Sequence, residues 1–112
     1  MKKFLTLIII IFSTTSSINA EEIKRIFVGN KDAKITIIAF ESLTCSHCAS
    51  FHKDVYPQLK KEYLDTGLAK IEFRHFPLDV AAFNASKVSQ CKNDGDSEIL
   101  NSLFANQQKW VK

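Results

Sequence analysis

The chain has 112 residues, of which 46% are hydrophobic and 24% charged, and its formal net charge is +3. Basic residues alternate with acidic ones and form no stripe beside aromatic residues, which argues against nucleic acid as a partner. Three cysteines are too few for a small protein held together by disulfides.

Residues 1–20 have the pattern of a secretory signal peptide. Lys2 and Lys3 form a positive start, residues 4–12 are apolar apart from Thr6, and a polar stretch of small residues ends at Ala20. This nine-residue stretch falls short of the roughly 20 apolar residues that a membrane-spanning helix needs, so we expect cleavage after Ala20. Export to the periplasm follows, where disulfides are permitted.

Cleavage there leaves one domain, residues 21–112. Lys2 and Lys3 are lost with the leader, so 13 of the 15 Lys and Arg remain against all 12 Asp and Glu, a net charge of +1. A chain of 92 residues can bury only a modest hydrophobic core.

Two strands are predicted early in this domain. Residues 25–28 form a short strand candidate, and residues 29–32 have the composition of a turn. Residues 35–40 are apolar on both faces and rich in β-branched side chains, as in a strand covered on both sides, so we expect this strand to be central. Residues 41–44 then cross its C-terminal end, where open α/β sheets place their sites.

Helical periodicity begins at Cys45. Apolar residues recur at three- and four-residue spacing, at Cys48, Phe51, Val55, Leu59 and Tyr63. Thr44 is the expected N-cap and Gly67 the expected stop. Pro57 lacks the N–H of the helical hydrogen bond, so we expect a bend between two helical halves.

A third strand and two more helices follow. Residues 69–76 alternate between apolar and polar, which predicts a strand with one buried face. Strand, helix and strand together predict a βαβ unit. Helical spacing returns over residues 80–92 and again over residues 97–110, with Asp96 or Ser97 as the cap of the last helix.

The motif Cys45-Ser46-His47-Cys48 stands between the second strand and the long helix. Two cysteines at this spacing can close a small disulfide ring, and a helix N-terminus stabilises the thiolate of the first through its peptide dipoles. The C-x-x-C pattern alone is a weak indicator, but a strand before it and a helix after it strengthen the prediction of a redox pair.

The chain resembles the DsbA-like branch of the thioredoxin superfamily, a group of exported protein-disulfide oxidoreductases. The resemblance runs from Gly29 to about Trp110. The residues that carry it are Gly29-Asn30-Lys31-Asp32-Ala33, Cys45-Ser46-His47-Cys48, Phe51-His52, Pro57, Phe73-Arg74-His75-Phe76-Pro77-Leu78, Asn84-Ala85-Ser86 and Leu103-Phe104. It implies an α/β, thioredoxin-like fold, with the N-terminal βαβ part over residues 21–79 and the start of a helical insertion over residues 80–112.

The resemblance also implies dithiol/disulfide exchange, with Cys45 as the exposed nucleophile and Cys48 as the resolving cysteine. His47, where the family often has histidine, would favour the Cys45 thiolate and make the protein an oxidant. The implied partners are reduced or unfolded exported proteins, together with a membrane protein for reoxidation. We expect no cofactor, no metal and no nucleic acid.

The family's fold continues with a cis-proline loop facing the cysteines, a strand pair and a closing helix. None of these precedes Lys112, and Pro77 is not that proline because it comes before the helical insertion. We therefore expect a truncated product or fragment of the enzyme, with about three strands and marginal stability.

Other interpretations of the motif stay open. A reductase or isomerase of the same fold would use the same two cysteines, and a non-catalytic fragment would use neither. A periplasmic metal-binding module would need ligands beyond Cys45 and Cys48, from among His52, His75 and Cys91. The chain has no second paired motif of the kind that structural zinc usually uses, which favours the redox pair.

Ordinary packing roles are expected for the remaining candidates. His52 is expected to be a partly exposed helix residue and His75 a hydrogen-bonded sheet residue. Cys91 falls on an apolar helical stripe, where a buried free cysteine acts as a small hydrophobic residue. The aromatic residues expected in the core are Phe51, Tyr56, Phe73, Phe76 and Phe83.

Overall fold

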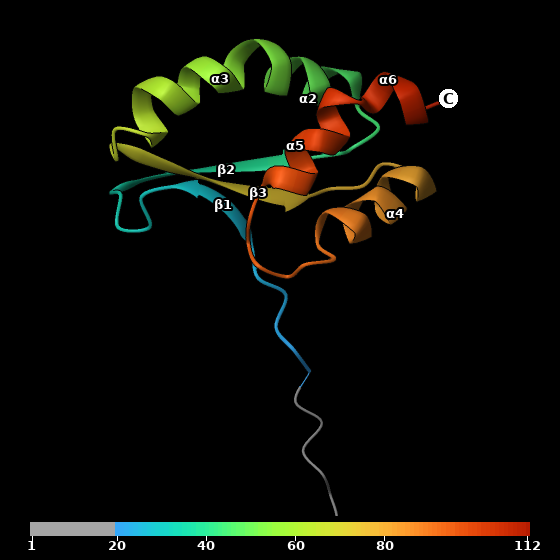
Figure 1. Cartoon of the computed structure of the whole chain (residues 1–112), viewed down its shortest axis with the longest axis horizontal. Coiled ribbons are helices and arrows are strands. Elements are labelled where there is room, and N and C mark those ends of the chain that lie inside the picture. Colours follow the sequence, from blue (N-terminus) through green and yellow to red (C-terminus); the bar gives the residue numbers. More distant parts are fainter. Residues whose placement is uncertain (1–19) are drawn as a thin grey trace, which may run out of the picture.

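The computed structural model describes residues 20–112, so the predicted signal peptide, apart from Ala20, lies outside the described residues. In the described part a small sheet carries one long helical segment across one face, and shorter helices gather at one end of the sheet (Figure 1). Within residues 20–112 no helix is both long and apolar enough to cross a membrane.

The sheet consists of β1 (Ile26–Gly29), β2 (Ile35–Glu41) and β3 (Ala69–His75), in the order β1-β3-β2. β3 pairs antiparallel with β1 and parallel with β2, and Ile37 lies opposite Ile71 in the parallel pair. The predicted βαβ unit and the expected three strands are therefore confirmed.

The prediction that residues 35–40 form the central strand is wrong. β3 is central, and β2 lies at an edge of the described sheet. Ile37 and Ala39 pack against the core, whereas Ile38 and Phe40 on the opposite face are 45% and 62% exposed. An apolar, β-branched run predicts an extended strand, but its place in the sheet depends on which strands pair with it, and the run itself does not encode this.

Helical structure extends from Ser46 to Leu64. It comprises α2 (Ser46–Ser50), the π-helix η1 (Phe51–Val55), α3 (Tyr56–Leu59) and the π-helix η2 (Lys60–Leu64). Pro57 lies in the first turn of α3, where its missing N–H is tolerated. Just before it the turn widens, so that the Tyr56 N–H bonds to the Phe51 carbonyl five residues back. Instead of one bend, the segment has two π turns and arches over the sheet (Figure 1).

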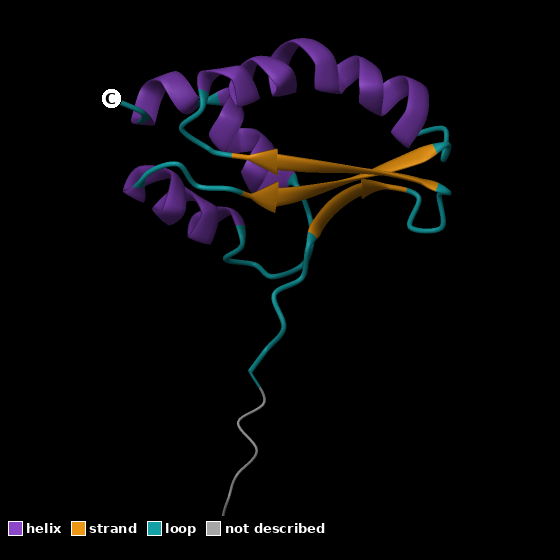
Figure 2. Ribbon diagram, turned by 180° about the vertical axis from the view of Figure 1, so that it is seen from behind, coloured by secondary structure: helices purple, strands orange, loops and turns teal. Residues whose placement is uncertain are grey.

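Three helices follow β3 and gather near the C-terminal ends of β2 and β3 (Figures 1 and 2). They are α4 (Val80–Ser89), α5 (Glu98–Ala105) and α6 (Gln107–Trp110). The carboxylate of Asp79 caps α4 by accepting the Ala82 N–H at 2.7 Å. Before α5 it is Asp96 that accepts a backbone N–H, that of Glu98, at 2.6 Å.

The core lies between the long helical segment and the inner face of the sheet, with α5 closing one end. Its buried residues are Ile26, Leu43, Tyr56, Leu64, Ala69, Ile71, Phe73, Ala85, Leu100 and Phe104. The prediction of Phe76 and Phe83 as core residues is wrong, since they are 60% and 50% exposed. The prediction of a buried Cys91 is also wrong, because α4 ends at Ser89 and Cys91 lies exposed in the turn beyond it.

Candidate active site

Cys45 is placed by a turn between β2 and α2. Its N–H donates to the Ser42 carbonyl at 3.0 Å, and its extended backbone (φ −76°, ψ 120°) makes Cys45 the N-cap of α2. The predicted N-cap, Thr44, instead donates its hydroxyl to Asp79 Oδ2 at 2.6 Å. The Cys45 thiol therefore lies beside the free N–H groups at the start of the helix.

These N–H groups favour the charged form of Cys45. The pKa of its thiol is lowered, first by the nearby Cys48 N–H and then by the Cys48 thiol and the His47 N–H. The sulfur lies near these groups without forming a side-chain cap hydrogen bond to the helix. Burial and the negative charge of Glu41 oppose this shift. The net result is a thiol predisposed to ionise at an N-terminal helix position.

Cys48 behaves in the opposite way. Burial is the first cause that raises the pKa of its thiol, and the nearby Cys45 and Glu41 raise it further. The Ser42 N–H acts in the other direction without reversing the shift. Two neighbouring thiols with pKa values moved apart match an attacking and a resolving cysteine.

His47 and Ser46, the two residues inside the motif, are both exposed. What reaches the Cys45 sulfur from His47 is its backbone N–H. A direct role for the His47 imidazole therefore stays a prediction, because solvent screens the effect of an exposed ring on the Cys45 thiol.

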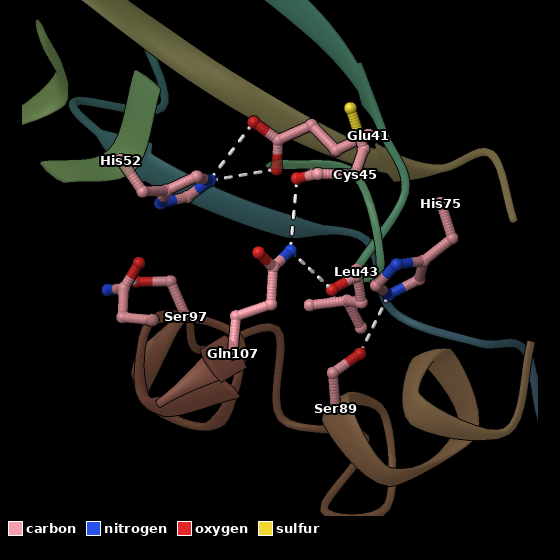
Figure 3. Close-up of polar contacts among 9 residues, drawn as sticks. Glu41, Leu43, Cys45, His52, His75, Ser89, Ser97 and Gln107 are labelled. Atoms are coloured by element: carbon pink, nitrogen blue, oxygen red, sulfur yellow. Dashed lines mark hydrogen bonds and ion pairs between the residues drawn. The ribbon is translucent and has the colours of Figure 1, made fainter. Parts of the chain in front are cut away.

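A buried polar pair lies next to the cysteines and was missed by the sequence analysis. His52 Nε2 lies 2.9 and 3.0 Å from the two carboxylate oxygens of Glu41, and both side chains are 6% exposed (Figure 3). The His52 ring stacks on Phe104 with a centroid separation of 4.1 Å. Since an ionised carboxylate only accepts, a hydrogen bond to ionised Glu41 requires a proton on His52 Nε2.

The expectation for His52 holds only in part: the residue as a whole is partly exposed, but its ring is enclosed. His75, as expected, is hydrogen-bonded, with Nε2 2.8 Å from Ser89 Oγ, and burial lowers its pKa. The ligands of the metal-binding interpretation are not brought together. In the described range 20–112 no group of three or more His, Cys, Asp or Glu could hold a metal ion.

The loop before Cys45 is tied to the loop after β3. The Phe76 N–H donates to the Glu41 carbonyl at 2.7 Å, and the Leu78 N–H donates to Ser42 Oγ at 3.3 Å. Phe76 and Leu78 are themselves 60% and 65% exposed. Apolar side chains therefore stand on the surface in a loop that is hydrogen-bonded to the cysteine loop.

Gln107 was likewise missed by the sequence analysis. Its side-chain Nε2 donates to the carbonyls of Leu43 and Cys45 at 2.8 and 3.0 Å (Figure 3). An amide on a helix more than sixty residues away has no local signature that would link it to this loop.

Comparisons with known proteins place these features in a family. The thioredoxin family model matches residues 21–112. The chain is 36% identical over 85 residues to a putative protein-disulfide oxidoreductase of Rickettsia bellii, covering 74% of this chain and 33% of that protein. It is 30% identical over 95 residues to disulfide bond formation protein D of Bacillus subtilis, covering 75% and 42%.

Solved structures agree with this result. Wolbachia pipientis alpha-DsbA1 is 34% identical with a TM-score of 0.71, over 82% of this chain and 47% of that one. A protein-disulfide isomerase of Novosphingobium aromaticivorans is 26% identical with a TM-score of 0.72, over 78% and 45%. The predicted α/β, thioredoxin-like fold is confirmed, and the chain spans less than half the length of each of these four relatives.

Proposed function

The chain belongs to the thioredoxin family, and we propose that it is a DsbA-like thiol:disulfide oxidoreductase that forms disulfide bonds in exported proteins through Cys45 and Cys48. The observation that carries this proposal is the difference between the two thiols. The pKa of Cys45 is lowered by the N–H groups of α2, whereas burial raises the pKa of Cys48. The names of the relatives support the same class of reaction.

In the proposed cycle the enzyme begins with a Cys45–Cys48 disulfide. A substrate thiolate attacks the Cys45 sulfur, which forms a mixed disulfide and releases Cys48 as a thiolate that takes up a proton. A second substrate thiolate then attacks the substrate sulfur of the mixed disulfide and releases the Cys45 thiolate. Two electrons pass from the substrate dithiol to the enzyme, and the substrate gains one disulfide.

The direction of transfer follows from the stability of the reduced form. N–H groups that stabilise the Cys45 thiolate favour the dithiol over the disulfide, which makes the pair an oxidant. The charge of Glu41 works against both thiolates and favours the alternative, a reductase or isomerase of the same fold. We propose the oxidant, because the N–H contribution outweighs that charge at Cys45.

The surface beside the cysteines suits unfolded protein substrates. Phe76, Leu78 and Val80 are 60%, 65% and 76% exposed and lie on or beside the loop that is bonded to residues 41–44. Exposed apolar side chains of this kind bind apolar segments that a folded substrate would bury. The signal-like sequence of residues 1–20 supports export to the periplasm, where a membrane partner would reoxidise the pair.

The proposal is tested by mixing the oxidised chain with a reduced, unfolded protein that has two cysteines. We expect the substrate to gain a disulfide as the Cys45–Cys48 disulfide is lost, in equal amounts. The Cys45→Ser variant is the control and should give only the background rate of air oxidation. The same background rate from the unmodified chain would overturn the proposal.

The reduction potential of the pair separates the oxidant from the alternative. Among thioredoxin-fold proteins, strong oxidants lie near about −120 mV and thioredoxin itself near about −270 mV. Equilibration with glutathione gives the potential. A value at the reducing end would favour the reductase.

A further inference from the structure

Gln107, the first residue of α6, joins the C-terminal helices to the loop that presents Cys45. Its side-chain Nε2 donates to the Leu43 and Cys45 carbonyls at 2.8 and 3.0 Å, and the residue is only 3% exposed (Figure 3). Both partners are carbonyl oxygens, which only accept, so both hydrogens of one amide nitrogen are used. The two contacts thus fix the amide's orientation as well as its position.

We propose that Gln107 is a positioning residue for the nucleophile, which holds the backbone on either side of Cys45 so that the thiol stays beside the N–H groups of α2. The inference rests on the proposed function and deepens it. It assigns a part in the redox chemistry to a residue that lies outside the cysteine motif.

The backbone geometry explains why such a restraint is needed. Cys45 is extended, while the residues after it are helical, so rotation of either adjoining peptide group would move the sulfur relative to the N–H groups at the start of α2. The Cys45 carbonyl accepts from Gln107 and also from the Ala49 N–H at 3.2 Å. The Leu43 carbonyl, two residues earlier, is fixed by the same amide. Gln107 therefore restrains the chain on both sides of the turn.

The effect of Gln107 comes from geometry, because its amide is neutral. The titratable groups that act on the Cys45 thiol are Cys48 and Glu41, which are both present whether or not the amide is. The groups that favour the thiolate are mainly N–H groups of the helix, and these act only at hydrogen-bonding distance. Displacing the sulfur would therefore weaken its stabilisation while leaving the surrounding charges unchanged.

α6 has a second attachment that does not involve the cysteine loop. The Trp110 side chain donates from Nε1 to the Leu103 carbonyl at 3.0 Å and packs against the core. The next residue, Gln108, is exposed and offers a matched control on the same helix. Replacing Gln107 should thus release the cysteine loop while Trp110 keeps α6 in place.

The test compares Gln107→Met, Gln107→Glu and Gln108→Met, each in a Cys91→Ser background so that the exposed third thiol does not react. Met has a similar length without an N–H donor, and an ionised Glu faces both carbonyls with acceptors only. Thiolate absorbance and the rate of Cys45 alkylation are measured against pH in the reduced chain. Thermal unfolding is recorded for each variant.

We expect Gln107→Met to raise the Cys45 pKa by about one unit, which means a tenfold smaller thiolate fraction at any pH well below the pKa. If the dithiol form becomes tenfold less stable relative to the disulfide, the reduction potential falls by about 30 mV. Gln107→Glu should also raise the Cys45 pKa. Its effect on Cys45 should weaken at acidic pH, where the protonated Glu side chain can again donate a hydrogen bond. Gln108→Met should titrate as the parent does.

The inference is overturned if both Gln107 variants fold and titrate like the parent, or if Gln108→Met shifts the Cys45 pKa equally. It is also overturned if both Gln107 variants fail to fold while Gln108→Met folds, since the role would then be purely structural. Failure of the proposed function has a different signature: the unmodified chain would transfer no disulfide to substrate, whatever the titration shows.

Discussion

His52 Nε2 lies 2.9 Å from Glu41 Oε2, and this contact joins the end of β2 to the long helical segment by a polar pair whose side chains are 6% exposed. The pair borders the cysteine motif, and the charge of Glu41 is the smallest of the causes that act on the two thiols: it partly offsets the lowering of the Cys45 pKa and adds to the raising of the Cys48 pKa. A carboxylate in this position opposes the effect of the helix N–H groups. In the proposed function, this opposition would make the cysteine pair less oxidising than the helix N–H groups alone would.

Removing the charge of Glu41 should make the pair more oxidising. Glu41→Gln keeps an oxygen that accepts from His52 but takes away the charge that disfavours both thiolates. We expect Cys45 to alkylate faster at a given pH and the reduction potential to rise by up to about 30 mV, one tenfold step. Glu72→Gln is the control, because the Glu72 carboxylate pairs with Arg74 and Arg25 and is not among the groups that act on the two thiols. An unchanged potential would contradict the role given to Glu41.

Removing His52 should destabilise the fold strongly. His52→Leu leaves the Glu41 carboxylate buried without its partner, and breaking a buried pair in this way costs about 3–5 kcal/mol. Adding Glu41→Gln should restore part of that loss, because a neutral amide is cheaper to bury than a charge. Urea unfolding measures both variants, with the exposed His47→Leu as the control. Equal stability of His52→Leu and the parent would show that the pair contributes little.

The two cysteines should respond differently to replacement. Cys45→Ser should abolish disulfide exchange, because it removes the thiol whose pKa is lowered. Cys48→Ser should accumulate mixed disulfides through Cys45, since no resolving thiol remains. Non-reducing electrophoresis followed by mass spectrometry detects these adducts. Equal trapping by the two variants would contradict the assigned roles. Cys91→Ser is the control and should leave exchange intact.

Stability should fall as the pH drops through the range of a buried histidine. Burial lowers the native pKa of His75, so the unfolded chain binds a proton, from about pH 6.5 downward, that the native state does not bind. Stability is therefore intact above that pH and decreases until the native pKa is reached. His75→Gln keeps a partner for Ser89 and should flatten this decrease in urea titrations. His47→Gln, at an exposed position, should leave the slope unchanged.

Local features of this chain were predictable from the sequence, and contacts between distant segments were not. The strand ending before Cys45, the helix after it and the alternation in residues 69–76 all follow from periodicity. The pairing of Glu41 with His52 was not predicted, because it crosses the loop and depends on the π turn at Phe51–Val55. Local propensity specifies which segments are extended or helical, and packing between distant segments decides which side chains meet.

The errors at Cys91 and at β2 have different origins. The apolar spacing that predicted a helix to residue 92 continues past the point where α4 ends, so Cys91 lies in an exposed turn. The run at residues 35–40 predicted a strand correctly but not its place in the sheet, which hydrogen bonding to β3 decides. The first error concerns where a helix ends, and the second concerns which strands are neighbours in three dimensions.

The contact of Trp110 with Leu103 gives the protein a built-in optical reporter. Trp110 is the only tryptophan in the chain, and its indole lies partly buried where α6 folds back on α5. Its emission should shift to longer wavelengths if α6 detaches, whereas far-ultraviolet circular dichroism follows the helices and sheet as a whole. Comparing the two signals during a titration would therefore distinguish release of the cysteine loop by α6 from global unfolding, without any added label.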